Sequence, residues 1–263
     1  MMTNDSPTES VIRVEDLTVA YGDFVVLRDV NFEIRRGEVF VILGGSGCGK
    51  STLLKHMIGL RQPVKGRVLI DGMDIVTATG DDLRTILRKI GVMYQQGALF
   101  GSMNLLENMQ LVLSEFTDLP PEAARQITRM KLKVVGLEGT EYKMPAELSG
   151  GMIKRAAIAR AMVIDPMILF LDEPSAGLDP ITAAQLDELV LKLARILKIT
   201  FVIVTHELPS IYAVADRVIM LDKESKGVIA TGKPEELRDH SDHPLVRQFF
   251  NRQAEAAAKD SDA

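Results

Sequence analysis

The sequence predicts an α/β fold in which helices cover both faces of a mixed sheet. Short apolar stretches, such as VFVILG and MILFL, have the length of buried strands and alternate with helical patterns, as in a parallel sheet. The N-terminal part carries β-branched residues interrupted by Gly, Asp and Asn, which predicts an antiparallel β subdomain. Between about residues 97 and 165 the apolar spacing becomes helical, which predicts an inserted α-helical subdomain.

Length and composition limit the class of protein. The chain has 263 residues, of which 46% are hydrophobic and 25% charged, so it can form one large domain or two small ones. A net charge of −5 argues against a strongly basic surface for nucleic acid. The single cysteine, Cys48, rules out an internal disulfide and indicates a reducing compartment.

No targeting or spanning segment is apparent. The first ten residues are polar and lack the apolar region of a secretory signal. The apolar runs are all shorter than the roughly 18 residues of a spanning helix. We therefore expect a soluble protein, which could still dock onto a membrane protein.

The elements follow one another in a simple order. VIRVEDLTVAYG, FVVLRDVNFEIRRGEVFVILG and GRVLIDGMDI predict strands and hairpins, and GALFGSMNLLENMQLVL through PPEAARQITRMKLKVVGL predicts helices. Next come the strand MILFLDEP, a helix from about Pro180 to Leu197, the strand TFVIVTH, a helix near Leu208, and the segment RVIMLDKESKGVIATG. We expect residues 1–10 to be a disordered tail, residues 11–240 to form the domain, and residues 241–263 to form a C-terminal extension and tail.

A phosphate-binding loop follows the strand VFVIL. GGSGCGKST matches G-x-x-x-x-G-K-[ST] and opens the predicted helix STLLKHMIGL, which is the context that this motif needs. Backbone N–H groups and the helix N-terminus would surround phosphate oxygens. Lys50 would hold the β- and γ-phosphates, Ser51 would ligate Mg²⁺, and Thr52 would add a phosphate contact. The alternative is a glycine-rich turn that matches by chance. The predicted ATP-binding residues here are Gly44, Gly45, Ser46, Gly47, Cys48, Gly49, Lys50, Ser51 and Thr52.

Two carboxylates end the strand MILFLDEP. Asp172 is placed to hold Mg²⁺, directly or through water, and Glu173 to orient and deprotonate the attacking water. Taken alone, such a pair could merely cap a turn. Together with the phosphate loop, it predicts a nucleotide-hydrolysing site.

A second phosphate-binding device is predicted in LSGGM. Ser149 is a candidate N-cap for the helix that begins near Met152, and Gly150 and Gly151 are unexplained by helix propensity. A glycine-softened helix N-terminus can bind phosphate. Because one chain has only one γ-phosphate to hold, we expect a homodimer in which each LSGGM closes on the nucleotide of the other subunit.

The ordered set of Tyr21, GGSGCGKST, Gln95, LSGGM, ILFLDE, SAGLD and His206 resembles the nucleotide-binding subunits of ABC transporters, over about residues 11–240. The resemblance implies a P-loop NTPase core that hydrolyses ATP with Mg²⁺. It implies that Tyr21 stacks on adenine, that Gln95 senses Mg²⁺ and water, and that Gln95 links the insertion to the core. It further implies that Asp179 crosses the dimer interface and that His206 contacts the γ-phosphate.

Some of these residues have alternatives. Tyr21 could be an ordinary turn aromatic, and Gln96 follows Gln95, so the Q-loop residue could be shifted by one. The chain also departs from the family pattern. Met152 stands where LSGGQ has glutamine, and Gly45 replaces a frequent proline. Neither change touches the predicted catalytic residues.

The segments QQGALFGSMNLLENM, LSGGM and DEPSAGLDPIT are similar to the ATPases of Mla-type systems, which move phospholipid between Gram-negative membranes. That resemblance implies a peripheral protein on the cytoplasmic face of the inner membrane. Its implied partners are an MlaE-like permease, a periplasmic lipid-binding MCE-domain protein and a small STAS-domain protein. The alternatives are another transporter ATPase (amino acid or lipopolysaccharide) and a non-transport ABC ATPase acting on ribosomes, DNA or iron–sulfur assembly. A P-loop GTPase or kinase is a third class, against which LSGGM argues.

Three further expectations come from single segments. The position of Cys48 near a helix N-terminus favours a reactive thiolate, although an inert filler is the alternative. In HPLVRQFFNRQ, residues at helical spacing predict packing on the core or on a partner protomer. After Gln95, an apolar cluster predicts a groove for a permease helix, although its single residues could each belong to the insertion's own core. These residues are Leu245, Val246, Phe249 and Phe250 in the first segment, and Ala98, Leu99, Phe100, Met103 and Leu105 in the second.

Overall fold

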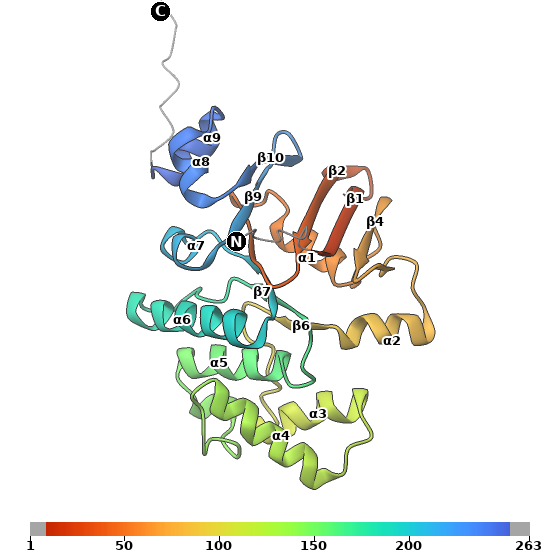
Figure 1. Ribbon diagram of the computed structural model, residues 1–263, viewed down its shortest axis with the longest axis vertical. Coiled ribbons are helices and arrows are strands. Elements are labelled where there is room, and N and C mark those ends of the chain that lie inside the picture. The colour runs from red at the N-terminus through yellow and green to blue at the C-terminus, as the bar shows by residue number, and fades with distance from the viewer. Residues whose placement is uncertain (1–8, 253–263) are drawn as a thin grey trace, which may run out of the picture.

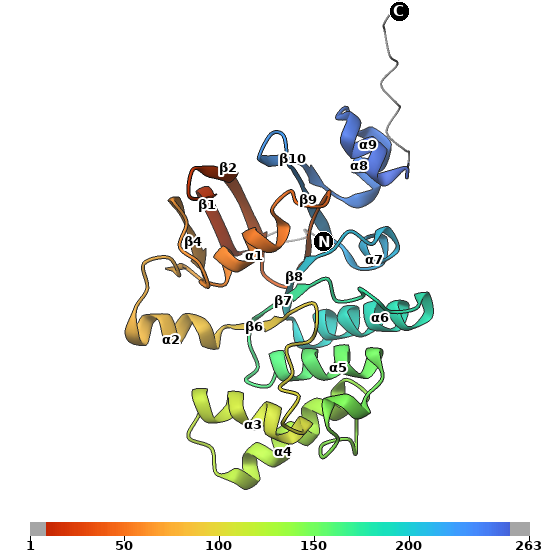
Figure 2. The ribbon, with the colours of Figure 1, turned by 180° about the vertical axis from the view of Figure 1, so that it is seen from behind.

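A computed structural model of the chain describes residues 9–252 and contains two sheets and a helical insertion (Figure 1). Both views place α3 (Leu105–Phe116), α4 (Pro121–Val134) and α5 (Gly150–Ala161) at the end of the molecule opposite α8 (Pro234–His240) and α9 (Pro244–Phe250) (Figures 1 and 2). The predicted fold class, an α/β core with an antiparallel subdomain and a helical insertion, is confirmed.

The first sheet is antiparallel and has the order β2-β1-β4-β5. Its strands are β1 (Ser10–Tyr21), β2 (Phe24–Arg35), β4 (Lys65–Ile70) and β5 (Met73–Asp74). The first strand begins inside the segment predicted to be a tail, so that boundary was wrong. Glu9 is held as well, because its carbonyl accepts a hydrogen bond from Arg36 N at 3.0 Å. Residues 1–8 lie outside the described residues.

The second sheet has the order β10-β9-β3-β8-β7-β6, and only β10 runs antiparallel to its neighbour. Its strands are β3 (Val39–Gly44), β6 (Ile90–Met93), β7 (Ile168–Asp172), β8 (Thr200–Val204), β9 (Arg217–Asp222) and β10 (Gly227–Gly232). Every residue of β3, β7 and β8 is buried, since both faces are covered. This explains why these strands are continuous apolar runs instead of alternating patterns.

The remaining helices are α1 (Lys50–Met57), α2 (Gly80–Arg88), α6 (Pro180–Leu197), α7 (Leu208–Val214), α8 (Pro234–His240) and α9 (Pro244–Phe250), with one 3₁₀ turn at Pro145–Glu147. The bounds of α6 are those predicted. Neither α2 nor β6 was among the elements predicted from the sequence. Both are short, with nine residues in α2 and four in β6, and α2 buries only Ile86.

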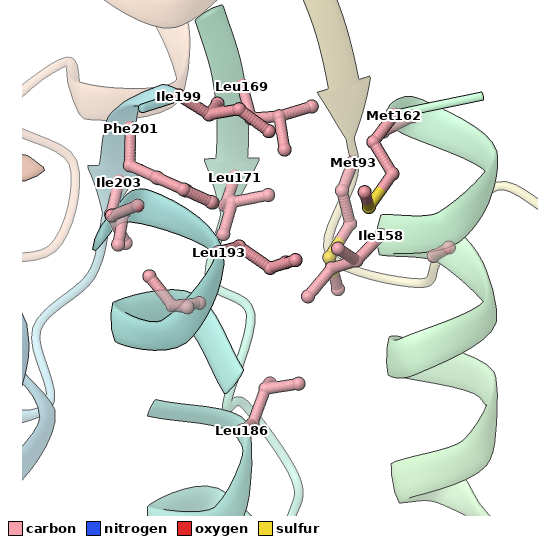
Figure 3. Close-up of a cluster of buried hydrophobic side chains, with 14 of the residues drawn as sticks. Met93, Ile158, Met162, Leu169, Leu171, Leu186, Leu193, Ile199, Phe201 and Ile203 are labelled. Carbon is pink, nitrogen blue, oxygen red and sulfur yellow. The ribbon is translucent and has the colours of Figure 1, made fainter. Parts of the chain in front are cut away.

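Two buried apolar clusters lie on the two faces of the second sheet. In β3, Val41 and Leu43 belong to one cluster, whereas Phe40 and Ile42 belong to the other, as the period of two requires. Figure 3 shows part of the first cluster, where Ile158 of α5 and Met162 lie beside Met93 of β6, near Leu193 of α6. The second cluster joins α1 and the antiparallel sheet to the core. The sheet is therefore held from both sides, and its strand ends are fixed.

The C-terminal helix α9 packs on its own core. Val246 and Phe250 are buried in the first cluster, and the ring centroid of Phe250 lies 6.0 Å from that of Tyr212. Leu245 and Phe249 are partly buried against the same cluster. The local-core version of the packing prediction is confirmed. Residues 253–263, which include the predicted tail, lie outside the described residues.

Between residues 9 and 252, no helix combines the length and the apolar character that crossing a membrane requires.

Candidate nucleotide-binding site

Parallel register brings the predicted motifs to one edge of the second sheet. Val204, the last residue of β8, pairs with Ile42 of β3 on one side and with Asp172 of β7 on the other. The carboxyl ends of β3, β6, β7 and β8 therefore lie side by side. This edge is where open α/β sheets bind ligands.

A cavity of about 760 Å³ opens at this edge. It is lined by Tyr21, Phe24, Val26, Gly44, Gly45, Ser46, Gly47, Gly49, Lys50, Ser51, Thr52, Gln95, Glu173, His206 and Phe249. The fold thus brings the phosphate loop together with Gln95, with Glu173, the predicted base, and with His206, which was predicted to contact the γ-phosphate. Gln96 is not among the lining residues, so Gln95 is the glutamine at this cavity.

The phosphate loop needs its glycines for backbone reasons. Gly44 has φ 148°, and a Cβ there would lie 2.4 Å from Leu221 O. Gly49, which caps α1, has φ 103°, and a Cβ there would meet Val26 at 3.0 Å. A side chain is excluded at both places, so the close packing and the positive φ angles of the loop both require glycine there. Lys50 Nζ donates to the carbonyls of Gly44 at 2.8 Å and Gly45 at 3.0 Å, so the ammonium lies across the loop mouth.

Asp172 and Ser51 meet beside the loop. Ser51 Oγ donates to Asp172 Oδ1 at 3.3 Å, although the two residues are far apart in sequence. Burial raises the pKa of Asp172, and the neighbouring Glu173 raises it further, whereas the Ser51 hydrogen bond opposes the shift. One hydroxyl and one carboxylate at this distance form a hard oxygen donor pair, which suits Mg²⁺ shared with nucleotide phosphates.

Glu173 is held in an unusual backbone conformation. Its φ is 47°, in the left-handed region that non-glycine residues rarely adopt, and its N–H donates to Val204 O at 2.8 Å. Its Oε1 atom lies 2.8 Å from His206 Nδ1. Among the atoms of residues 9–252, Glu173 Oε2 is buried without a hydrogen-bond partner. A buried, unpaired carboxylate oxygen in a phosphate site is placed to accept a hydrogen bond from water.

An apolar wall completes the cavity, and sequence reasoning found only part of it. Tyr21 is 44% exposed and its ring carries the Arg61 guanidinium at 5.1 Å. Phe24, Val26 and Phe249 also line the cavity but were not predicted. For Phe24 a signal existed, because Gly22 and Asp23 between it and Tyr21 are typical of a two-residue hairpin turn, and the structure pairs Phe24 with Tyr21. For Phe249 there was no local signal, since it comes from the far end of the chain.

Cys48 differs from the prediction of a reactive thiolate. The residue is 2% exposed, burial raises the pKa of its thiol, and its sulfur packs under the loop 2.6 Å from where a Gly44 Cβ would stand. The nearby Lys50 lowers this pKa, but burial is the larger influence. The premise of a thiolate favoured by the helix N-terminus was therefore wrong, and Cys48 can offer only its backbone to a ligand.

The second predicted half of the site lies elsewhere. Ser149 caps α5 by accepting from Met152 N at 3.3 Å, and Asp179 caps α6 by accepting from Ile181 N at 3.1 Å. None of the four residues predicted to act in trans lines the cavity of its own chain: Ser149, Gly150, Gly151 and Asp179.

Gly150 and Gly151, the two glycines of LSGGM, have different surroundings. A Cβ on Gly151 would lie 2.6 Å from Thr182 Cγ2, so this glycine is needed where the start of α5 packs on α6. Gly150 is exposed, and a Cβ there would make only an ordinary contact with Leu178 at 3.5 Å. Only Gly150 therefore lacks an explanation inside its own chain.

The predicted groove after Gln95 is only partly exposed. Phe100 is 45% exposed under the Arg160 guanidinium, which lies 5.4 Å from the ring centroid. Leu99 is partly buried against the core. Leu105 is completely buried, so its assignment to a partner groove was wrong and it belongs to the insertion's own core.

Comparisons with known proteins agree with this geometry. The family model described as ABC transporter matches residues 27–176. The chain is 44% identical over 245 residues to the probable ribonucleotide transport ATP-binding protein mkl of Mycobacterium leprae, covering 93% of this chain and 70% of that protein. It is 36% identical over 251 residues to the intermembrane phospholipid transport system ATP-binding protein MlaF of Haemophilus influenzae, covering 95% of this chain and 94% of that protein.

Solved structures show the same architecture. The dimeric post-hydrolysis structure of the ATP-binding cassette MJ0796 with ADP and Pi superposes with a TM-score of 0.76 at 33% identity, covering 84% of this chain and 98% of that one. The structure of cbiO1 from Clostridium perfringens, part of the transporter complex cbiONQ, gives a TM-score of 0.79 at 32% identity, with 93% and 96% covered. The chain therefore belongs to the ATP-binding subunits of ABC transporters, a family whose membership implies ATP binding and hydrolysis.

Proposed function

We propose that this subunit hydrolyses Mg·ATP in the cavity at the strand ends and powers phospholipid transport between Gram-negative membranes. The observation that carries the hydrolytic assignment is the convergence of Lys50, Ser51, Asp172, Glu173 and His206 on one cavity edge. The near end-to-end match to MlaF of Haemophilus influenzae supports the choice of phospholipid.

Each residue has a proposed part in hydrolysis. Tyr21 stacks on adenine, and the loop N–H groups and Lys50 hold the phosphates. Ser51 and Asp172, with Gln95 at the cavity edge, would hold Mg²⁺, which would neutralise charge on the phosphates. Glu173 accepts a proton from the attacking water through its unpaired oxygen, and His206 approaches the γ-phosphate.

Hydrolysis in this proposal needs a second copy of the chain. Ser149, Gly150 and Asp179 lie on helix starts that do not reach their own cavity, and the exposed Gly150 leaves backbone free to approach a phosphate. The dimeric form of the related cassette MJ0796 supports a homodimer in which these residues complete the partner's site.

The proposed assembly follows from the phospholipid assignment. The homodimer binds an MlaE-like permease at the cytoplasmic face of the inner membrane. An MCE-domain protein binds lipid on the periplasmic side, and a small STAS-domain protein binds in the cytoplasm. The exposed Phe100, directly after the Q-loop, is the proposed point where a permease helix docks.

Ribonucleotide transport is a second candidate substrate class. The observation that favours it is the higher identity, 44%, to the protein named as a probable ribonucleotide transport ATP-binding protein. That match leaves about a third of the relative uncovered, because the chain spans 70% of it. We rank it second for this reason.

The test is transport by the complex that a tagged chain retains when it is purified from its source in mild detergent. In proteoliposomes, we expect ATP-dependent transfer of fluorescent glycerophospholipid and no ATP-dependent uptake of radiolabelled ribonucleotide. A complex with Glu173→Gln is the matched control and should transfer neither. Uptake of ribonucleotide without lipid transfer would replace the first candidate with the second.

A further inference from the structure

Lys154 is a buried cation that the proposed chemistry does not use. It lies on α5, five residues after the Ser149 cap, and is 6% exposed. Its Nζ donates to the Gln95 carbonyl and lies 3.5 Å from the Glu173 carbonyl. A buried ammonium is costly unless its hydrogens are used, and here they are used on backbone rather than on a carboxylate.

One partner of Lys154 is the Q-loop, which α5 also holds at two more points. Gly97 has φ 81°, and a Cβ there would lie 3.1 Å from Ile153 of α5, so the loop lies directly on the helix. Arg160 donates to Ala98 O at 3.1 Å. The helix α5, which begins at LSGGM and is called the signature helix below, therefore holds the backbone of residues 95–98 at several points.

The other partner is the peptide of Glu173, whose left-handed conformation needs support. Its N–H is held by Val204 O, and its carbonyl accepts from Ala176 N at 3.2 Å and faces the Lys154 ammonium. Because these contacts determine where Cα and Cβ lie, they determine where the Glu173 carboxylate points. The contacts therefore support the approach of Oε1 to His206.

We propose that Lys154 is a positioning residue for hydrolysis, which holds the backbone at Gln95 and Glu173 in a fixed relation to the start of the signature helix. The proposal rests on the proposed function of Glu173. In the proposed dimer, α5 of one protomer contacts the nucleotide bound by the partner. The Lys154 ammonium of that protomer then links α5 to Gln95 and Glu173, which act on the protomer's own nucleotide.

A purely structural lysine is available for comparison in the same insertion. Lys131 of α4 is 3% exposed, and its Nζ pairs with Asp165, remote from the cavity. Both lysines are buried, so the replacement of either by methionine removes a buried charge. Lys131→Met is therefore the matched control for Lys154→Met.

The first measurement is steady-state hydrolysis by the full chain, together with equilibrium binding of a fluorescent ATP analogue. We expect Lys154→Met to lower kcat between about tenfold and 100-fold while analogue affinity stays within about twofold, as for a misplaced catalytic group. Lys154→Arg keeps the donors and should recover most of kcat. Lys131→Met should lower the melting temperature but leave kcat unchanged.

The second measurement does not depend on catalysis. Hydrogen exchange should become faster in peptides spanning residues 94–100 and 172–176 in Lys154→Met, and faster around residues 128–135 in Lys131→Met. If Lys154→Met does not fold, Lys154→Gln replaces it, since the shorter amide cannot reach both carbonyls. Unchanged kcat, unchanged exchange at both sites, or equal loss of kcat in both methionine variants would overturn the inference. Full hydrolysis by Glu173→Gln would instead reject the proposed function, and the exchange result would still decide whether Lys154 holds the two segments.

Discussion

The two halves of the nucleotide site are built in different ways. The half at the strand ends takes Lys50, the pair Asp172 and Glu173, and His206 from three segments that the parallel register aligns, and these segments border a cavity within one chain. The half at the helix starts takes Ser149–Gly151 and Asp179 from α5 and α6, which pack on each other through Gly151 and Thr182. None of these four residues lines the cavity of its own chain.

The first half is complete once the chain has folded, whereas in the proposed dimer the second half acts only after two chains have assembled. Substitutions in the first half should change chemistry in each subunit, because sheet register already places all its groups. Substitutions in the second half should divide into those that disturb the α5–α6 contact and those that disturb only the partner's nucleotide. The following experiments test that division.

The largest effect is expected from Glu173→Gln. The amide cannot accept the proton of the attacking water, so kcat should fall by about 10²–10⁴-fold. ATP binding should persist, because Lys50 and the phosphate loop are intact, and a closed dimer should accumulate. Hydrolysis by the assembled complex and size-exclusion chromatography with ATP measure both results. Wild-type turnover would exclude Glu173 as the base.

Lys50→Ala should act on binding first. Its ammonium spans the Gly44 and Gly45 carbonyls at the loop mouth, so its loss removes the phosphate cation and loosens the loop. We expect ATP affinity to fall by at least about tenfold, equivalent to about 1.4 kcal/mol. Isothermal titration checks this. An unchanged dissociation constant would mean that the cavity is not the phosphate site.

Gly151→Ala and Gly150→Ala separate the two roles of the signature loop. The first places a methyl group 2.6 Å from Thr182 Cγ2, and overpacking should cost about 1–3 kcal/mol, or roughly 2–4 °C in melting temperature per kcal/mol. Adding Thr182→Ser removes that methyl contact and should restore the melting temperature.

Gly150→Ala should leave the melting temperature unchanged or slightly higher, since alanine favours the helix and finds room. It should nevertheless reduce hydrolysis by the dimer, because in the proposed dimer the added methyl group would crowd the close approach of this helix start to the partner's phosphate. Normal ATP hydrolysis by Gly150→Ala, or an unchanged melting temperature of Gly151→Ala, would contradict the separate roles of these two glycines.

Phe100→Glu should leave ATP binding by the isolated subunit unchanged and reduce recovery of the permease in a pull-down. The side chain is 45% exposed, so the charge is tolerated in the subunit but not in an apolar contact. Tyr142→Glu, at another exposed aromatic of the insertion, is the control and should retain the permease. Equal permease recovery from both variants would place the docking surface elsewhere.

The smallest effect is expected from Asp187→Asn, at the contact between α6 and α7. Asp187 accepts a hydrogen bond from Ser210 Oγ at 2.8 Å, and burial raises its pKa. A raised folded-state pKa means that its contribution to stability is complete below about pH 3.9 and is lost as pH rises through the folded-state value. The asparagine variant should therefore melt with the wild type in acid and slightly above it at pH 7. If the difference in melting temperature between the variant and the wild type is the same at all pH values, the ionised Asp187 carboxylate does not destabilise the folded state.

The fold and the strand-end half could be read from the sequence because their signals are local. Apolar runs such as β3, β7 and β8 are buried on both faces, and the loop motif needs glycine at Gly44 and Gly49, where φ is positive. Contacts between remote segments gave no such signal. Phe249 at the cavity, Gly151 against Thr182 and Lys154 under the Glu173 peptide all depend on tertiary packing. The burial of Cys48 reversed a local expectation for the same reason, since burial outweighed the charge of Lys50.

The place of Phe249 has a practical consequence for spectroscopy. This residue lines the nucleotide cavity, and the exposed Asn251 and Arg252 follow it by only two and three positions. A small environment-sensitive fluorophore on a cysteine introduced at position 251 would report on nucleotide occupancy. The native Cys48 need not be removed first, because its buried sulfur should resist labelling.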